Sequence, residues 1–209
     1  LIYGIEKALT PQDLRGQRIL VTAGPTQEAM DPVRFLSNHS TGKMGYAVAD
    51  RAAIRGAEVT LVSGPTALAV PEDVQRVDII SARDMYDAVI SRADRQDMII
   101  KAAAGGDYRP AETAPEKLKK GDGEMTVALA RNPDILAELG RRKHPGQLLC
   151  GFAMETQNLL DNAESKLQRK NCDMLVANSL RDKGAGFGTD TNVATLLFAD
   201  GRRETPPMM

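Results

Sequence analysis

The segment RILVTAG, residues 18–24, is a short apolar run that ends in glycine. This pattern is typical of a strand that is buried on both faces of a sheet. A loop follows, and small and apolar residues then recur at helical spacing from Lys43 to Arg55, with Gly56 as the expected helix end. The next run, EVTLVSGP, reads as a second strand. This order predicts two parallel strands joined by a helix.

The same alternation continues along the chain. Further strands are expected at VQRVDII, DMIIKAAAGG, LLCGFAME and DMLVANS, and helices at SARDMYDAVISRADR, NPDILAELGRRK and NLLDNAESKLQRKN. Two segments break this rhythm and look like hairpins, KLKKGDGEMTVALA (117–130) and NVATLLFADGRRETP (192–206). We therefore predict an α/β fold with a doubly wound, Rossmann-like, mostly parallel sheet and antiparallel hairpin additions.

Composition narrows the class of protein. A chain of 209 residues with 42% hydrophobic content can bury one sizeable core, and a net charge of -1 gives no bulk attraction to nucleic acid or anionic membranes. Cys150 and Cys172 lie far from any CxxC spacing, and with only His39 and His144 no zinc set is expected. No apolar run approaches the ~18 residues of a membrane span. We expect a reduced, cytoplasmic protein without nucleic-acid or membrane partners.

The long loop from Pro25 to Met44 is the first candidate site, because ligands of open α/β sheets bind beyond the carboxyl ends of the strands. Its segment SNHSTG offers hydroxyls, an amide and backbone N–H groups at a helix start, where the helix dipole favours an anion. The spacing fits neither a Walker loop nor a dinucleotide fingerprint. Ser40 and Thr41 could equally serve only as helix caps, with Asn38 making a turn.

Two groups of lysines form a second candidate. Lys166 and Lys170 lie four residues apart on one predicted helix, and Lys117, Lys119 and Lys120 follow a polar loop. Lysines at such spacing are usually solvated. If both groups lie at one end of the sheet, they could together hold a polyphosphate.

Five blocks, in this order and spacing, resemble bacterial phosphopantothenoylcysteine synthetase: AGPTQEAMDPVRFLSNHSTGKMG, DYRPAETAPEKLKK, NPDI, GFAMET and KLQRKNCDMLVAN. The resemblance runs from about Gly16 to Gly201. It implies a CTP-dependent ligase of coenzyme A biosynthesis that joins 4'-phosphopantothenate to L-cysteine. The reaction would pass through an acyl-cytidylate and release CMP and pyrophosphate, with Mg²⁺ accompanying CTP.

The resemblance also implies an organisation. Residues 16–209 would form the nucleotide-dependent synthetase domain, cut short at the C-terminus, and residues 1–15 a linker or the remnant of an upstream domain. In bacteria that upstream domain is commonly a flavin-dependent decarboxylase of the same multifunctional chain, so FMN would belong only to the absent part. The family is dimeric, and we expect a homodimer.

Site residues follow from the matching positions. The nucleotide-binding residues would be Asp107, Lys117, Asn132, Pro133, Asp134, Ile135, Phe152, Lys166 and Lys170. The substrate-binding residues would be Gly24, Pro25, Thr26, Asn38, Ser40, Thr41, Gly42 and Lys43. Asn38, which would contact the activated carbonyl, and Lys117 would be catalytic, and no protein metal ligand is expected.

The chain departs from the family pattern at Gly105-Gly106, where Val-Ala or a similar pair is usual. Two other functions stay open. A Rossmann-type nicotinamide-dependent oxidoreductase would need a glycine fingerprint that TAGPTQEA lacks, and a non-catalytic nucleotide-binding module would need no chemistry. The glycine-rich segment 179–192 is expected to be either a mobile lid or an ordinary surface loop.

Overall fold

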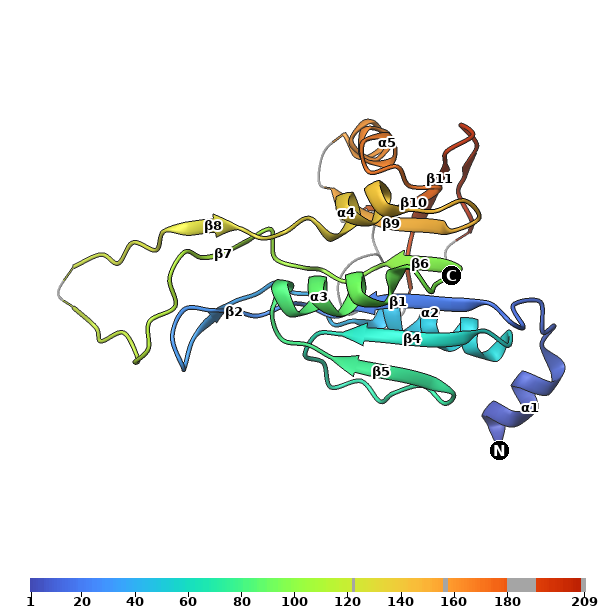
Figure 1. Ribbon diagram of the computed structural model, residues 1–209, viewed down its shortest axis with the longest axis horizontal. Coiled ribbons are helices and arrows are strands. Elements are labelled where there is room, and N and C mark those ends of the chain that lie inside the picture. The colour runs from blue at the N-terminus through green and yellow to red at the C-terminus, as the bar shows by residue number, and fades with distance from the viewer. Residues whose placement is uncertain (122, 156–157, 180–190, 208–209) are drawn as a thin grey trace.

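The computed structural model describes residues 1–121, 123–155, 158–179 and 191–207, and is built around one eight-stranded sheet (Figure 1). The strands, in the spatial order β12-β11-β10-β9-β6-β1-β4-β5, are Arg203–Glu204, Ala194–Phe198, Met174–Ser179, Leu148–Glu155, Met98–Lys101, Arg18–Ala23, Glu58–Ser63 and Val74–Asp78. The helices are α1 Ile2–Leu9, α2 Lys43–Ile54, α3 Ala82–Ala93, α4 Ile135–Arg142 and α5 Leu159–Arg169.

The pairing of the strands confirms the predicted fold class. Along the sheet, the strands β5, β4, β1, β6, β9 and β10 are each parallel to the next. Strand β11 is antiparallel to both of its neighbours, β10 and β12. The predicted hairpin near the C-terminus is therefore present, with Gly201 in its turn at a φ of 87°. The antiparallel addition lies at one edge of the sheet, so the parallel strands keep all their carboxyl ends on one side.

Both faces of the sheet are buried under other parts of the chain. The central strands therefore consist of continuous runs of apolar residues. Leu20 of β1 and Ile99 of β6 pack in one core cluster with residues of α3, α4 and α5. Ile19 and Val21 of β1 face the other way and pack with residues of α2. Because side chains alternate along a strand, Lys101 lies on the Ile99 face, toward α3, α4 and α5.

The two helices of the first half begin differently. Ser81 caps α3 in a capping box with Asp84, which confirms a start at Ser81 or Ala82. The expectation that Ser40 and Thr41 cap α2 is wrong, because the N-cap is Gly42, with a φ of 84° and no side-chain cap hydrogen bond. The left-handed turn at Gly42 leaves the two hydroxyl residues in the loop before the helix.

A projecting arm extends from the carboxyl edge of the sheet (Figure 1). It consists of the pair β2 Glu28–Ala29 and β3 Phe35–Leu36, the pair β7 Tyr108–Pro110 and β8 Leu129–Arg131, and the loop between β7 and β8. The hairpin expected within 117–130 is thus wrong, because Leu129–Arg131 pairs with Tyr108–Pro110 instead. The turn expected at GDG includes residue 122, which lies outside the described residues.

The remaining segments take up the ends of the chain. Residues 1–15, predicted to be a linker or remnant, include α1, in which no residue is buried. Glu6 pairs with Arg51 at 2.6 Å, and so α1 contacts α2 through exposed charges. Most of the segment predicted as a lid, residues 180–190, lies outside the described residues. No helix in the described part of the chain is long and apolar enough to cross a membrane.

Candidate active site

A cavity of about 450 Å³ lies beyond the carboxyl ends of β6 and β9, beside the start of α4, and we call it the nucleotide pocket because residues predicted to bind a nucleotide line it. Eight of the nine predicted nucleotide residues line it: Asp107, Asn132, Pro133, Asp134, Ile135, Phe152, Lys166 and Lys170. The ninth, Lys117, does not. It lies on the exposed arm loop with Lys119 and Lys120, so the two lysine groups are separate within this chain.

The NPDI segment forms one wall of this pocket. The Asn132 side chain donates to Gly106 O at 2.9 Å, and the Asn132 backbone N–H donates to Asp107 O at 2.9 Å. Asp134 caps α4 by accepting from Ala137 N at 2.9 Å. The segment therefore holds the Asp107 backbone and presents the positive end of the α4 dipole to the cavity.

Two lysines, one in α5 and one at its C-cap, also line the pocket. Lys166 Nζ donates to Phe152 O at 2.8 Å, and Lys170 Nζ is hydrogen-bonded to Asp134 Oδ2, with the Lys170 side chain only 14% exposed. Burial acts to raise the pKa of Asp134, but the hydrogen bonds from Lys170 and the α4 backbone hold it below its usual value. These two lysines are thus held in place in the pocket. They are not the freely solvated surface lysines that their spacing usually indicates.

Lys101 is a pocket residue that the sequence analysis missed. It ends the apolar strand β6, lines the nucleotide pocket, and its Nζ donates to Ala103 O at 2.8 Å. Burial lowers its pKa to about 8, and the charge of Lys166 acts in the same direction. A lysine inside an otherwise apolar strand was the signal that could have identified it.

The predicted substrate segment meets the nucleotide pocket at its wall. Asn38 Nδ2 donates to Ala104 O at 2.5 Å, and Thr26 Oγ1 accepts from Gly106 N at 2.9 Å. Pro25 forms a bridge with Ala104 beside Gly24. None of the eight predicted substrate residues lines the nucleotide pocket itself. Gly24, Pro25, Thr26 and Asn38 contact Ala104 or Gly106 beside it, while Ser40, Thr41, Gly42 and Lys43 lie at the start of α2. Asn38 and Thr26 are therefore the residues that join the two regions.

Buried carboxylates tie the arm to the rest of the site. Asp31 has a fully buried side chain that pairs with Arg34 at 2.6 Å and accepts from Leu118 N at 3.1 Å. Arg34 also donates to Leu118 O at 2.9 Å, and its hydrogen bond to Asp31 holds the pKa of that carboxyl well below its usual range. The backbone next to Lys117 is thereby fixed to the loop that carries Asn38. This contact joins residues 87 positions apart and was not predicted from the sequence.

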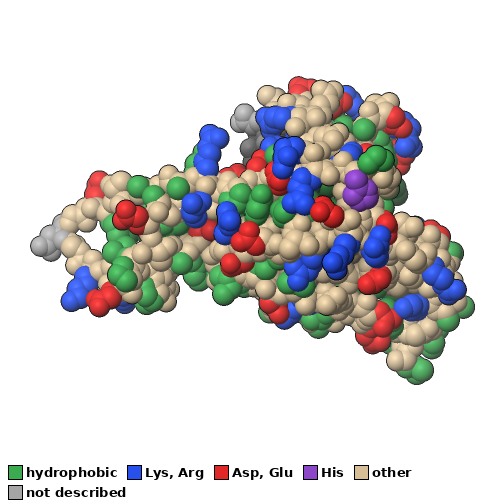
Figure 2. Space-filling model, in the orientation of Figure 1, with side chains coloured by type: hydrophobic (Ala, Val, Ile, Leu, Met, Phe, Trp, Pro, Cys, Tyr) green, Lys and Arg blue, Asp and Glu red, His purple; other side chains and the backbone are tan. Residues whose placement is uncertain are grey.

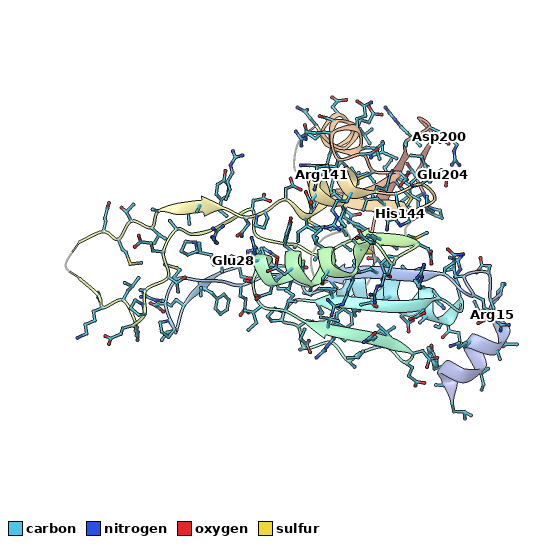
Figure 3. All side chains as sticks on the ribbon, viewed as in Figure 1. Arg15, Glu28, Arg141, His144, Asp200 and Glu204 are labelled. Carbon is cyan, nitrogen blue, oxygen red and sulfur yellow. The ribbon has the colours of Figure 1, made fainter. Side chains whose placement is uncertain are left out.

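Glu28, at the base of the arm beside α3 (Figure 3), is the second such carboxylate. It is buried, and its Oε1 accepts from Ala82 N at 2.9 Å in the first turn of α3. A side chain at Gly106 would come within 3.4 Å of Glu28 Cγ and 3.3 Å of Tyr108 O. The second glycine of the Gly105-Gly106 pair therefore fits a close approach between the arm and the pocket wall.

A second cavity, of about 490 Å³, adjoins the first and shares Arg131, Asn132 and Pro133 with it. Its other lining residues are Arg83 and Arg109, so no carboxylate lines it. Lys and Arg side chains are spread among Asp and Glu over the face shown in Figure 2. The described residues bring no three His, Cys, Asp or Glu side chains together as a metal site. Cationic side chains therefore line both cavities.

Curated relatives match nearly all of this chain. The chain is 48% identical over 201 residues to the Coenzyme A biosynthesis bifunctional protein CoaBC of Bacillus subtilis (strain 168), covering 96% of this chain and 49% of that protein. It is 46% identical to the protein of the same name from Escherichia coli (strain K12), covering 93% and 48%. The chain thus spans about half the length of these relatives.

Solved structures and a family model agree with this. A crystal structure of the C-terminal domain of a Coenzyme A biosynthesis bifunctional protein CoaBC has a TM-score of 0.79 and 45% identity, covering 93% of this chain and 87% of that one. The DNA/Pantothenate Metabolism Flavoprotein from Streptococcus pneumoniae has a TM-score of 0.77 and 25% identity, covering 91% and 92%. The family model described as "DNA/pantothenate metabolism flavoprotein C-terminal domain" matches residues 14–209, and this chain therefore belongs to that family.

Proposed function

We propose that this domain is a phosphopantothenate–cysteine ligase of coenzyme A biosynthesis that uses CTP and forms an acyl-cytidylate. The observation that carries the proposal is the nucleotide pocket, in which Asp107, the NPDI segment and the lysines of α5 surround one cavity beside Asn38. The names of the relatives, which refer to coenzyme A biosynthesis, support the same reaction class.

The chemistry needs two displacements and no protein nucleophile. First, a carboxylate oxygen of phosphopantothenate bonds to the α-phosphorus of CTP, the bond to the β-phosphate oxygen breaks, and pyrophosphate leaves. The amine of cysteine then bonds to the acyl carbon, the bond to the phosphate oxygen breaks, and CMP leaves while the amine loses a proton. Catalysis of such steps depends on position and on neutralised phosphate charge.

The residues of the site suit these roles. Lys166 and Lys170 would neutralise phosphate charge, and the start of α4 would favour an anion nearby. Asn38 would orient the activated carbonyl from the other side of Ala104. Lys117 would reach the phosphates only through movement of the arm loop or from a second copy of the chain.

Mg²⁺ would enter with CTP. Magnesium commonly binds through substrate phosphates with one or two protein carboxylates, and Asp107 and Asp134 are the carboxylates that line the nucleotide pocket. When bound, the ion would neutralise phosphate oxygens.

A homodimer formed through the arm is part of the proposal. Arm residues with large apolar side chains are exposed: Val33, Phe35, Tyr108, Leu118, Met125 and Leu129. Exposed apolar patches of this kind mark interfaces. Sedimentation at micromolar concentration should give twice the chain mass, and a monomer would contradict the dimer.

The relatives are about twice as long as this chain and are named bifunctional. We propose that a cytoplasmic fusion protein carries the decarboxylase with its FMN in the part outside this chain. Turnover of the ligase reaction should then be independent of FMN.

The deciding experiment supplies CTP, 4'-phosphopantothenate and cysteine and measures pyrophosphate release. Release that requires phosphopantothenate supports the ligase, while CTP binding without release supports a non-catalytic module, and hydride transfer from a nicotinamide cofactor would support the oxidoreductase. Lys117→Gln should abolish release with the fold intact, with Lys119→Gln and Lys120→Gln as controls from the same loop. Equal loss in all three variants would contradict a specific role for Lys117.

A further inference from the structure

Lys101 occupies a costly position for a cation. It lies in the middle of the sheet, between Thr22 of β1 and Gly151 of β9, at the end of a strand whose preceding residues are apolar. Removing an ammonium group from water is unfavourable unless other groups compensate. Methionine or leucine would fill the same space without this cost, so the charge itself calls for an explanation.

The hydrogen bonds of this ammonium are incomplete. An ammonium group has three N–H donors, and the described residues offer Lys101 Nζ one acceptor, Ala103 O at 2.8 Å. A Cβ atom at Gly105 would lie 3.9 Å from Nζ, so a longer side chain at 105 would crowd the group. The glycine found there, where the family pattern has a larger residue, leaves the remaining donors open to a ligand in the nucleotide pocket.

Lys101 also lies at the junction of the two proposed half-sites. Its ammonium holds Ala103 O, while Asn38 Nδ2 holds the next carbonyl, Ala104 O, at 2.5 Å. In the proposed site the acyl group lies near Asn38 and the nucleotide lies near Asp134. In the acyl-cytidylate the α-phosphate is the group that joins the acyl group to the cytidine.

We infer that Lys101 is a further catalytic residue, whose ammonium donates to an α-phosphate oxygen of CTP and then of the acyl-cytidylate. This inference rests on the proposed function. In the first displacement the ammonium stabilises charge on the α-phosphate as the bond to pyrophosphate breaks. In the second it stabilises the electron pair that stays on the CMP oxygen when the acyl carbon–oxygen bond breaks.

The charges around Lys101 define a test by pH. Lys166 of α5, Asp107 after β6 and Asp134 at the N-cap of α4 act on it by charge. The other charged or titratable groups that line the same pocket are Tyr108, Arg131, Arg169 and Lys170. Because the pKa of Lys101 is lowered to about 8, the free protein loses this cation as pH rises through that value. The rate constant kcat/KM for CTP, which reports the free protein, should then fall above pH ~8.

The measurement is steady-state pyrophosphate release from CTP and phosphopantothenate with saturating cysteine, between pH 6.5 and 9.5. Pyrophosphate leaves before cysteine reacts, so kcat/KM for CTP reports the first displacement. Lys101→Met should lower kcat/KM about 100-fold, the loss expected when one group that stabilises transition-state charge is removed. Because Met removes a half-buried charge, its melting temperature should equal or exceed that of the wild type. Lys101→Arg keeps its charge throughout and should lose the decline above pH 8. Lys119→Met, on the exposed loop, is the matched control.

The outcomes separate the two proposals. No pyrophosphate release by the wild type would overturn the ligase function, and this inference with it. Release by the wild type and equally by Lys101→Met would overturn only the role of Lys101. If Lys101→Met does not fold, the arginine variant decides, because a decline near pH 8 that survives in it cannot come from Lys101.

Discussion

Gly140→Ala should destabilise the protein although alanine is the better helix former. Gly140 lies in α4 against the end of α5, where an added Cβ would be 1.9 Å from Lys170 O and 2.8 Å from Lys170 C. Ordinary contact begins at 3.4 Å, so the two backbones must move apart by about 1.5 Å. Forcing such a shift in a packed region costs up to about 3 kcal/mol, against a gain of about 1 kcal/mol in helix propensity.

The net effect should be a loss of about 2 kcal/mol in the free energy of unfolding, or about 4–8 °C in melting temperature for a chain of this size. Because the shift moves the residue whose Nζ pairs with Asp134, we also expect CTP affinity to fall about tenfold. Thermal unfolding and calorimetric titration with CTP measure the two effects. Gly4→Ala is the control, since Gly4 lies in a helix with open space around it. A melting temperature of Gly140→Ala at or above that of the wild type would refute the packing argument.

Three further predictions concern single side chains. Asn38→Asp should slow amide formation more than CTP binding, because a new carboxylate repels the acyl-cytidylate, so that intermediate should accumulate in quenched reactions; unchanged turnover would contradict its role. Asp31→Asn should speed trypsin cleavage after Lys117 several-fold and lower kcat, because the arm loop loses its attachment to Asp31. Cleavage at the wild-type rate would show that Asp31 does not hold the loop. Burial raises the pKa of Cys150 to about 12 and that of Cys172 to about 11, so at pH 8 both stay protonated and should react with a disulfide reagent only after unfolding; rapid labelling of the native protein would contradict this.

Periodicity predicted the elements whose residues pack locally. The run LLCGFAME coincides with β9, Leu148–Glu155, because both faces of this strand are covered. Ser81 identified the start of α3 because its partner Asp84 lies three residues away. In both cases the interactions that define the element are close in sequence.

The arm could not be predicted from periodicity, because the residues that contact each other in it are far apart in the sequence. Strands of two or three residues have no readable period, and the bonds that hold them, such as that from Leu118 N to Asp31, join residues 87 positions apart. The pocket residues came from the family resemblance, which transfers positions but not contacts. The sequence did show a lysine at the end of an apolar strand, but that Lys101 lines a cavity together with Ile135 and Phe152 depends on elements far apart in the sequence.

The turn after β1 passes so close to the end of β4 that a Cβ at Gly64 would lie 1.8 Å from Pro25 O. Ala104 N donates to Gly24 O, Gly106 N donates to Thr26 Oγ1, and the turn is thereby held on its other side as well. This turn has little conformational freedom before a substrate binds, so binding costs little entropy there. The entropy lost on binding should then come mainly from the ligand and from side chains outside this turn.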